Sequence, residues 1–184
     1  MNPLKALSEY GQSVWLDYIR RNLIATGELK RLVEEDGLAG VTSNPAIFEK
    51  AITGSTDYTE DLVALQEQDF DPASVFERLA VRDIQDAADV LRPLFNRTNR
   101  RDGFVSLEVS PFKANETEAT IEEARRLWSA VGRENLMIKV PATPAGLPAI
   151  ETLIGEGINV NITLLFAREA YERVAEAYLR DSNL

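Results

Sequence analysis

Short runs of apolar residues alternate along the chain with longer stretches in which apolar residues recur at helical spacing. The short runs predict five β-strands and the longer stretches predict helices between them. The predicted strands are Ser13 to Asp17, Ala39 to Asn44, Phe104 to Val109, Leu136 to Val140 and Ile158 to Thr163. The predicted helices are Glu28 to Asp36, Asn44 to Ala51, Asp57 to Gln68, Pro72 to Thr98, Glu116 to Val131, Pro144 to Ile154 and Arg168 to Arg180, with Pro93 interrupting the longest. Repeated strand–helix units are typical of a parallel sheet, and the lack of a linker-like stretch indicates one domain over residues 1–184.

Each predicted strand has one apolar face and one face that becomes polar toward its carboxyl end. Alternate side chains of a strand point to opposite sides, and in the last strand apolar residues alternate with Asn159, Asn161 and Thr163. A (β/α)8 TIM barrel accounts for this pattern, because inward-pointing residues near the carboxyl ends of its strands build the active site. A doubly wound open sheet, whose strands are apolar on both faces, is the alternative architecture. We therefore expect an α/β fold of the TIM-barrel type, represented by about five βα units.

Composition limits the chemistry that such a fold could support. The chain has no histidine and no cysteine, which removes imidazole bases, thiolate nucleophiles, ordinary zinc sites and disulfides. Its formal net charge of −10 argues against nucleic acid or an anionic membrane as the main partner. The amino-terminal residues lack the apolar region of a signal peptide and no apolar run approaches the length of a membrane span, so we expect a cytoplasmic protein.

Lys139 is the one cation in the apolar run from Leu136 to Pro141. Burial disfavours the charged form of a lysine, and a neutral amine in an apolar pocket attacks ketones and aldehydes to form an imine. A lysine near a strand end more commonly extends its charged group into solvent, and that interpretation holds for Lys139 considered alone. The polar residues predicted on the same face as Lys139 are Asp17, Asn44, Glu108, Asn161 and Thr163.

Each of these polar residues has a structural explanation of its own, such as capping a helix or pairing with an arginine. Their placement on one face of five strands favours a joint chemical role. An imine-forming amine needs carboxylates that move protons and donors that hold the hydroxyls of a sugar. The pattern therefore predicts Schiff-base chemistry.

Four segments in register resemble transaldolase, the dihydroxyacetone transferase of the pentose phosphate pathway. They are Gly40 to Phe48, Val105 to Pro111, Ile138 to Thr143 and Asn159 to Phe166. The resemblance implies a (β/α)8 barrel and a class I aldolase mechanism without metal or other cofactor. It also implies the transfer of a dihydroxyacetone unit from a ketose phosphate, such as sedoheptulose 7-phosphate or fructose 6-phosphate, to an aldose phosphate.

The resemblance assigns catalytic roles to four residues. Lys139 looks like the Schiff-base nucleophile, and Asp17 resembles the acid/base that takes the C4 hydroxyl proton as the carbon–carbon bond breaks. Glu108 and Thr163 resemble the pair that positions a water for proton transfer while the imine forms and is hydrolysed.

Four further residues are predicted to bind the substrate. Asn44 and Asn161 resemble the residues that form hydrogen bonds with the bound three-carbon unit. Thr42 and Ser106 share the polar faces of the second and third predicted strands and complete the expected binding set.

The resemblance extends through the fifth βα unit, and the sequence then stops at Leu184. In the family, strands six to eight supply serine and arginine contacts to the substrate phosphate. Five of eight strands leave two open edges, so we expect either self-association or a C-terminal segment that completes the barrel. Two alternatives to transaldolase remain. One is a catalytically incomplete half-barrel that self-associates, and the other is a different class I aldolase, such as one acting on deoxyribose phosphate.

Overall fold

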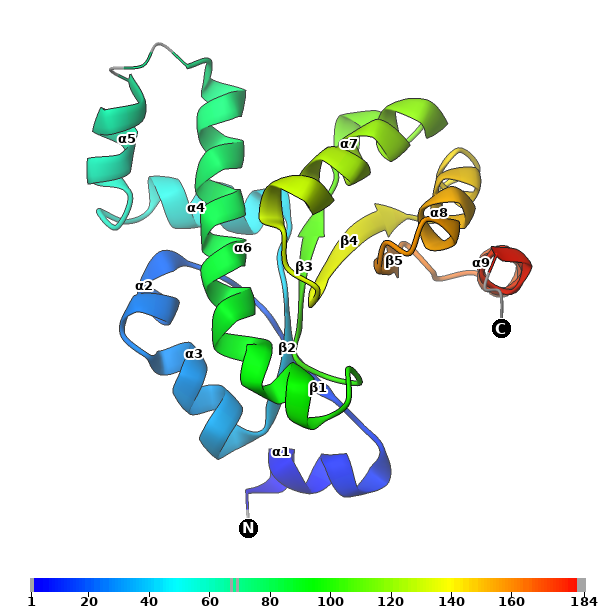
Figure 1. Cartoon of the computed structure of the whole chain (residues 1–184), viewed down its shortest axis with the longest axis horizontal. Helices are drawn as coiled ribbons and strands as arrows, with labels where there is room; N and C mark the ends of the chain where they lie inside the picture. Colours follow the sequence, from blue (N-terminus) through cyan, green and yellow to red (C-terminus); the bar gives the residue numbers. More distant parts are fainter. Residues whose placement is uncertain (1, 67, 69, 182–184) are drawn as a thin grey trace. The chain divides into compact units, whose positions relative to one another are not determined.

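The computed structural model describes residues 2–66, 68 and 70–181 and contains a five-stranded sheet in an α/β fold (Figure 1). The strands are β1 (Val14–Asp17), β2 (Leu38–Thr42), β3 (Phe104–Glu108), β4 (Leu136–Pro141) and β5 (Val160–Thr163). β1 pairs with β2 and β4 pairs with β5, both in parallel. The strand order is β1-β2-β3-β4-β5. A doubly wound sheet reverses its strand order at a switch point, so the sequential order is the one expected of a barrel.

Helices connect the strands in the order that the sequence predicts. α1 (Pro3–Ala6) and η1 (Leu7–Tyr10) precede β1, and three segments follow it: α2 (Arg21–Ala25), α3 (Glu28–Arg31) and η2 (Leu32–Asp36). β2 is followed by α4 (Pro45–Thr53), α5 (Thr59–Gln66) and α6 (Pro72–Arg97), and β3 by η3 (Pro111–Lys113) and α7 (Thr117–Val131). α8 (Gly146–Gly155) connects β4 to β5, and α9 (Arg168–Asp181) comes after β5. None of the helices among the described residues has the length and apolar character needed to cross a membrane.

The predicted interruption at Pro93 is wrong, because α6 continues through this residue to Arg97. Leu91, Leu94 and Phe95 on either side of the proline are buried. A proline inside a helix costs about 3 kcal/mol, and we attribute the continuity to the packing of this apolar face. At its other end α6 begins where the sequence predicts, with Asp71 accepting hydrogen bonds from the amides of Ala73 and Ser74.

Other boundaries differ by a few residues from the prediction. The helix expected from Asp57 begins at Thr59, and its expected end includes residue 67, which lies outside the described residues. The helix expected from Pro144 begins at Gly146, since the Thr143 hydroxyl accepts a hydrogen bond from the Gly146 amide and holds the preceding turn. The sequence does not predict helix α2, because five residues are too few to show helical periodicity.

The chain divides into two compact units, and the division passes through β3. Unit 1 contains Met1–Val105 and Arg133–Asn135, and unit 2 contains Ser106–Gly132 and Leu136–Leu184. The core of unit 1 includes one face of α6, and the core of unit 2 includes α7, α8 and the apolar face of β4. The fully buried residues include Val41, Ile84, Ala87, Ala88 and Leu91 in unit 1 and Ala124, Val131, Ile138, Val140, Ile150 and Leu153 in unit 2.

Candidate active site

Lys139 extends from β4 on the face opposite the core of unit 2. Its neighbours Ile138 and Val140 are fully buried, whereas Met137 and Lys139 are partly exposed, as the alternation in the sequence predicts. The Lys139 Nζ lies 3.1 Å from Oε2 of Glu108 on β3, and the two side chains are only 15% and 20% exposed. The ion pair places a proton acceptor directly beside the amine.

Asn161 and Ser106 form a second polar contact on this face of unit 2. Asn161 is the register partner of Lys139, and its Nδ2 donates a 2.9 Å hydrogen bond to Oγ of the fully buried Ser106. β4 lies between the strands that carry these two residues. In a flat sheet, two strands on either side of a third are about 9.5 Å apart. Two short side chains that stand perpendicular to such a sheet cannot reach each other over this distance. The sheet of unit 2 therefore bends toward the face that carries Lys139.

Thr163 lies two residues beyond Asn161, on the same face and at the carboxyl end of β5. Its carbonyl accepts a 2.8 Å hydrogen bond from the Ala142 amide, which fixes the ends of β4 and β5 together. The next residue, Leu164, has a φ of 61°, in the left-handed region that residues other than glycine seldom occupy. Leu164 therefore stores local backbone strain directly after the candidate site residue.

Unit 1 contains the other three predicted residues. Thr42 is the register partner of Asp17, and its hydroxyl donates a 2.6 Å hydrogen bond to Asp17 Oδ1. Asn44 caps α4, with its Oδ1 accepting a 2.9 Å hydrogen bond from the Ile47 amide. The capping function is the structural explanation that the sequence offered for Asn44, and it occupies only the oxygen of the amide group.

Gly40 lets Trp15 lie flat on the same face of β1 and β2. The two residues are register partners, and a Cβ at Gly40 would lie 2.4 Å from Trp15 Cε2. A side chain at residue 40 would therefore push the indole away, and with it the strand face from which Asp17 and Thr42 extend.

The structure thus brings the predicted residues together in two groups, one in each unit. Unit 1 contains Asp17, Thr42 and Asn44, and unit 2 contains Ser106, Glu108, Lys139, Asn161 and Thr163. Direct contacts join Asp17 with Thr42, Glu108 with Lys139 and Ser106 with Asn161. The roles of the eight residues stay predictions.

Unit 1 also contains a buried polar cluster that the sequence pattern did not predict. The carboxylate of the fully buried Asp83 accepts hydrogen bonds from Nε of Arg21 at 2.9 Å and from the hydroxyl of Tyr58 at 2.6 Å. Arg21 also forms an ion pair with Asp61, and its guanidinium lies over the Tyr58 ring at 4.5 Å. The Arg21 amide donates to the Tyr58 hydroxyl at 3.1 Å, so the cluster fixes the segment after β1 and Asp17.

Burial governs the electrostatics of this cluster. Desolvation raises the pKa of the Asp83 carboxyl, while the hydrogen bonds from Tyr58 and Arg21 act in the opposite direction. Burial and the adjacent Asp83 raise the pKa of the Tyr58 phenol. One feature of the sequence could have revealed the cluster. Asp83 stands four residues after Leu79 and four before Ala87, within the apolar stripe of its helix, where a carboxylate needs partners.

Residues 14–183 match the family model described as transaldolase/fructose-6-phosphate aldolase. The chain belongs to this family. It is 52% identical over 179 residues to transaldolase 2 of Nostoc punctiforme, an alignment that covers 97% of this chain and 47% of that protein. It is 49% identical over 180 residues to the transaldolase of Thiobacillus denitrificans, with 98% and 50% covered. Identity to the transaldolase of Neisseria meningitidis serogroup C is 47% over 180 residues, with 98% and 51% covered.

Membership of the transaldolase family confirms the resemblance drawn from the four sequence segments and the α/β fold of the TIM-barrel type. The chain spans about half the length of the curated relatives that it matches.

Proposed function

We propose that the protein is a transaldolase that transfers a dihydroxyacetone unit between sugar phosphates through an imine on Lys139. The observation that carries the proposal is the ion pair between Lys139 and Glu108 on a strand face whose opposite side is fully buried. Family membership supports it, since each of the three relatives described above is named a transaldolase.

Imine formation begins at Lys139. Glu108 takes a proton from the ammonium, and the free amine attacks the ketose carbonyl carbon to give a carbinolamine. Loss of the carbinolamine hydroxyl as water requires a proton, which Glu108 returns, and Thr163 helps to hold the water. Hydrolysis at the end of the cycle reverses these steps.

Carbon–carbon cleavage is assigned to Asp17. The protonated imine withdraws electrons from the adjacent bond, and Asp17 takes the proton of the C4 hydroxyl as the bond breaks. The aldose leaves, the three-carbon enamine stays on Lys139, and an acceptor aldose then forms the new bond. Thr42 orients Asp17 by its hydrogen bond to Oδ1, which leaves Oδ2 to meet the hydroxyl. Asn44 and Asn161 bind the three-carbon unit, and Ser106 orients Asn161.

The proposed partners are sugar phosphates and the remaining strands of the barrel, supplied by a C-terminal segment or by another chain. Large exposed apolar side chains after β5 support the proposal that further strands pack against this chain. Leu164, Phe166, Tyr171 and Leu179 are 59%, 92%, 62% and 68% exposed. The phosphate contacts belong to those remaining strands in this proposal, as the resemblance to the family implies. The charge of phosphorylated sugars keeps them within the cell, so a cytoplasmic location belongs to the same proposal.

Borohydride trapping tests the nucleophile. Incubation with fructose 6-phosphate or dihydroxyacetone, followed by borohydride, should leave a reduced covalent adduct on Lys139 that peptide mass mapping locates. Lys139→Met should abolish the adduct, whereas Lys113→Met, which removes another lysine of unit 2, should not. An adduct on Lys5, Lys30, Lys50 or Lys113 would refute the assignment.

Substrate dependence separates the proposed function from its alternatives. A transaldolase turns over fructose 6-phosphate only when an acceptor such as erythrose 4-phosphate is added, whereas an aldolase releases dihydroxyacetone without one. An aldolase acting on deoxyribose phosphate would instead form its borohydride-reduced adduct with that sugar. Absence of any adduct, in this chain and in one extended to the length of its relatives, would favour the catalytically incomplete half-barrel.

A further inference from the structure

Glu123 is a buried carboxylate on α7 to which the proposed reaction assigns no role. Its side chain is only 9% exposed. The buried residues of α7 are Thr120, Ile121, Glu123, Ala124, Leu127 and Val131, so the carboxylate belongs to the face of the helix that packs against unit 2. A carboxylate is seldom buried unless ion pairs and hydrogen bonds offset the loss of its hydration. The partners of Glu123 therefore indicate its role.

The carboxylate of Glu123 contacts both ends of the turn that follows β3. This turn is η3, which Ser110 directly precedes and Lys113 ends. Oε2 of Glu123 accepts a 3.1 Å hydrogen bond from the Ser110 amide and lies 3.6 Å from the Lys113 Nζ. The other oxygen, Oε1, lies 3.6 Å from Nη2 of Arg126 on the same helix. Two cations thus balance the buried charge while one oxygen holds the backbone of the turn.

The turn is connected to Glu108 through a single residue. Glu108 ends β3, and only Val109 separates it from Ser110. The Val109 amide donates a 3.2 Å hydrogen bond to the Lys139 carbonyl, so β4 holds the first residue after Glu108. Glu123 holds the second. Because a side chain at a strand end follows its backbone, release of Ser110 would let the Glu108 carboxylate move away from the Lys139 amine.

Two threonine hydroxyls connect the same turn to the loop after β4, the strand that carries Lys139. The Thr143 hydroxyl donates a hydrogen bond to the Ala114 carbonyl. The Thr117 hydroxyl donates to the Ala145 carbonyl at 2.7 Å. The loops that follow Glu108 and Lys139 are therefore joined, and Glu123 fixes the first of them to α7.

We propose that Glu123 is a positioning residue that keeps Glu108 beside Lys139 while the imine forms. It acts through the backbone of Val109 and Ser110 and exchanges no proton with the substrate. The inference rests on the proposed function, because it concerns the part that Glu108 plays there.

The rate of borohydride trapping by dihydroxyacetone measures imine formation and tests this role. Glu123→Ala should slow trapping about 10- to 100-fold, the scale expected when a catalytic group moves by about 1 Å. Glu123→Gln keeps an acceptor oxygen for the Ser110 amide and should slow it less than about threefold.

Two variants of the same helix are the controls. Glu122→Ala removes an exposed carboxylate, and Ile121→Val removes a buried methyl group without removing a hydrogen bond. Neither should change the trapping rate more than about twofold. Slowing in Ile121→Val as large as in Glu123→Ala would show an effect of lost stability alone and would overturn the proposal.

A cycle of single and double variants tests whether Glu123 acts through Glu108. Glu123→Ala should slow trapping in the unmodified chain and cause no further slowing when Glu108→Gln is already present, because the group that it positions is then missing. A general structural role would slow both backgrounds by the same factor, and that result would overturn the proposal.

Hydrogen exchange of backbone amides, followed by NMR, tests the anchor without any reaction. Glu123→Ala should speed the exchange of the Val109 and Ser110 amides about tenfold, as expected for losing one charged hydrogen bond, whereas Glu122→Ala should leave both unchanged. Unchanged exchange in Glu123→Ala would overturn the proposal even where trapping succeeds. Failure of trapping in the unmodified chain would count against the proposed function alone, since the exchange rates would still show whether Glu123 holds this turn.

Discussion

Units 1 and 2 both present polar side chains on a strand face, but they hold them by different means. In unit 2, Glu108 and Lys139 extend from adjacent strands and pair directly, and the residues beside Lys139 in β4 are fully buried. In unit 1, the exposed Asp17 ends its strand and contacts Thr42, and the buried cluster of Arg21, Tyr58 and Asp83 holds the next segment in place.

The difference shows two ways of fixing a candidate catalytic carboxylate. Glu108 is the last residue of β3, but the Val109 amide after it donates a 3.2 Å hydrogen bond to the Lys139 carbonyl, so pairing with β4 holds the backbone on both sides of Glu108. Asp17 also ends its strand, and the segment that follows it is held by the buried cluster of Arg21, Tyr58 and Asp83, whose charges must offset a large desolvation cost. Unit 1 should therefore be the more sensitive of the two to a single substitution remote from its candidate site residues.

The largest expected effects would come from the two carboxylates themselves. In the intact protein Asp17→Asn should lower transaldolase turnover roughly 100- to 10,000-fold, the usual scale for loss of general acid/base catalysis, yet leave imine trapping intact. Glu108→Gln should slow trapping itself, because proton transfer to and from the Lys139 amine is lost. Time-resolved borohydride trapping measures the difference.

Exposed carboxylates on neighbouring helices provide the controls for that experiment. Asp86→Asn in unit 1 and Glu122→Gln in unit 2 carry the same changes in chemistry and should alter neither trapping nor turnover. Equal trapping rates in Asp17→Asn and Glu108→Gln would contradict the separate roles proposed for these two carboxylates.

The next effect concerns stability and separates the units directly. Asp83→Ala leaves Arg21 without its buried partner, which should lower the free energy of unfolding by about 3–5 kcal/mol. Each unit contains one tryptophan, Trp15 in unit 1 and Trp128 in unit 2. In a Trp128→Phe background, tryptophan fluorescence during urea unfolding reports on unit 1 alone. Asp83→Ala should lower the urea concentration at the midpoint of this transition.

Two variants test whether buried charge explains that loss. Asp86→Ala, on the exposed side of the same helix, should change the free energy of unfolding by less than about 0.5 kcal/mol. The double variant Arg21→Met with Asp83→Leu should recover most of the stability, because it removes both charges from the interior. A loss in Asp83→Ala no greater than in Asp86→Ala would contradict a supporting role for the cluster.

The smallest effect depends on pH and involves one surface ion pair in unit 1. Arg133 donates to Asp89 at 2.6 and 2.9 Å, and its guanidinium holds the pKa of the Asp89 carboxyl below the ordinary value of 3.8. A lowered pKa in the folded state stabilises the protein above pH 3.8, and this contribution is lost as the pH falls through the lowered value. Because both side chains are about a third or more exposed, the contribution should not exceed about 1 kcal/mol.

The measurement is the difference in unfolding free energy between the protein and Arg133→Gln as a function of pH. The difference should be greatest near pH 6 and should shrink as the pH falls below 3.8. A difference that is independent of pH would show that Arg133 acts by packing and not by its charge. In unit 2, Arg125 likewise lowers the pKa of the Glu156 carboxyl below its ordinary value of 4.5. The difference in unfolding free energy between the protein and Arg125→Gln should therefore begin to shrink at a higher pH, as the pH falls below 4.5.

Local periodicity predicted much of the fold. The five strands lie within two residues of their predicted bounds, and the alternation in β4 correctly placed Lys139 opposite Ile138 and Val140. The same rule placed Glu108 and Lys139 on one face, and the structure brings them into contact. The prediction at Pro93 was wrong because a rule about one residue does not include the burial of its helix against the rest of unit 1.

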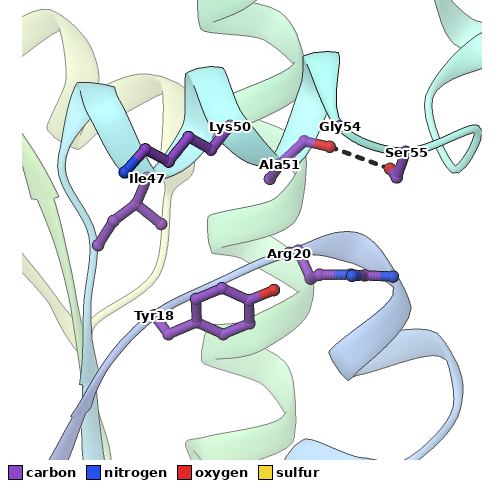
Figure 2. Close-up of a pocket in the computed structure, with 7 residues that line it drawn as sticks. All are labelled: Tyr18, Arg20, Ile47, Lys50, Ala51, Gly54 and Ser55. Carbon is purple, nitrogen blue, oxygen red and sulfur yellow. Dashed lines mark hydrogen bonds between the residues drawn. The ribbon is translucent and has the colours of Figure 1, made fainter.

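The sequence by itself determined the βα order, the two-faced strands and the exclusion of histidine and cysteine chemistry, because each depends on residue type or on spacings of a few residues. Tertiary structure alone decided which polar groups are paired. Arg21 meets Asp83 across 62 residues of sequence, and Tyr18 and Arg20 meet one face of α4 to line a pocket (Figure 2). Such contacts depend on how distant segments pack, and no local pattern specifies which of many possible partners a buried charge will meet.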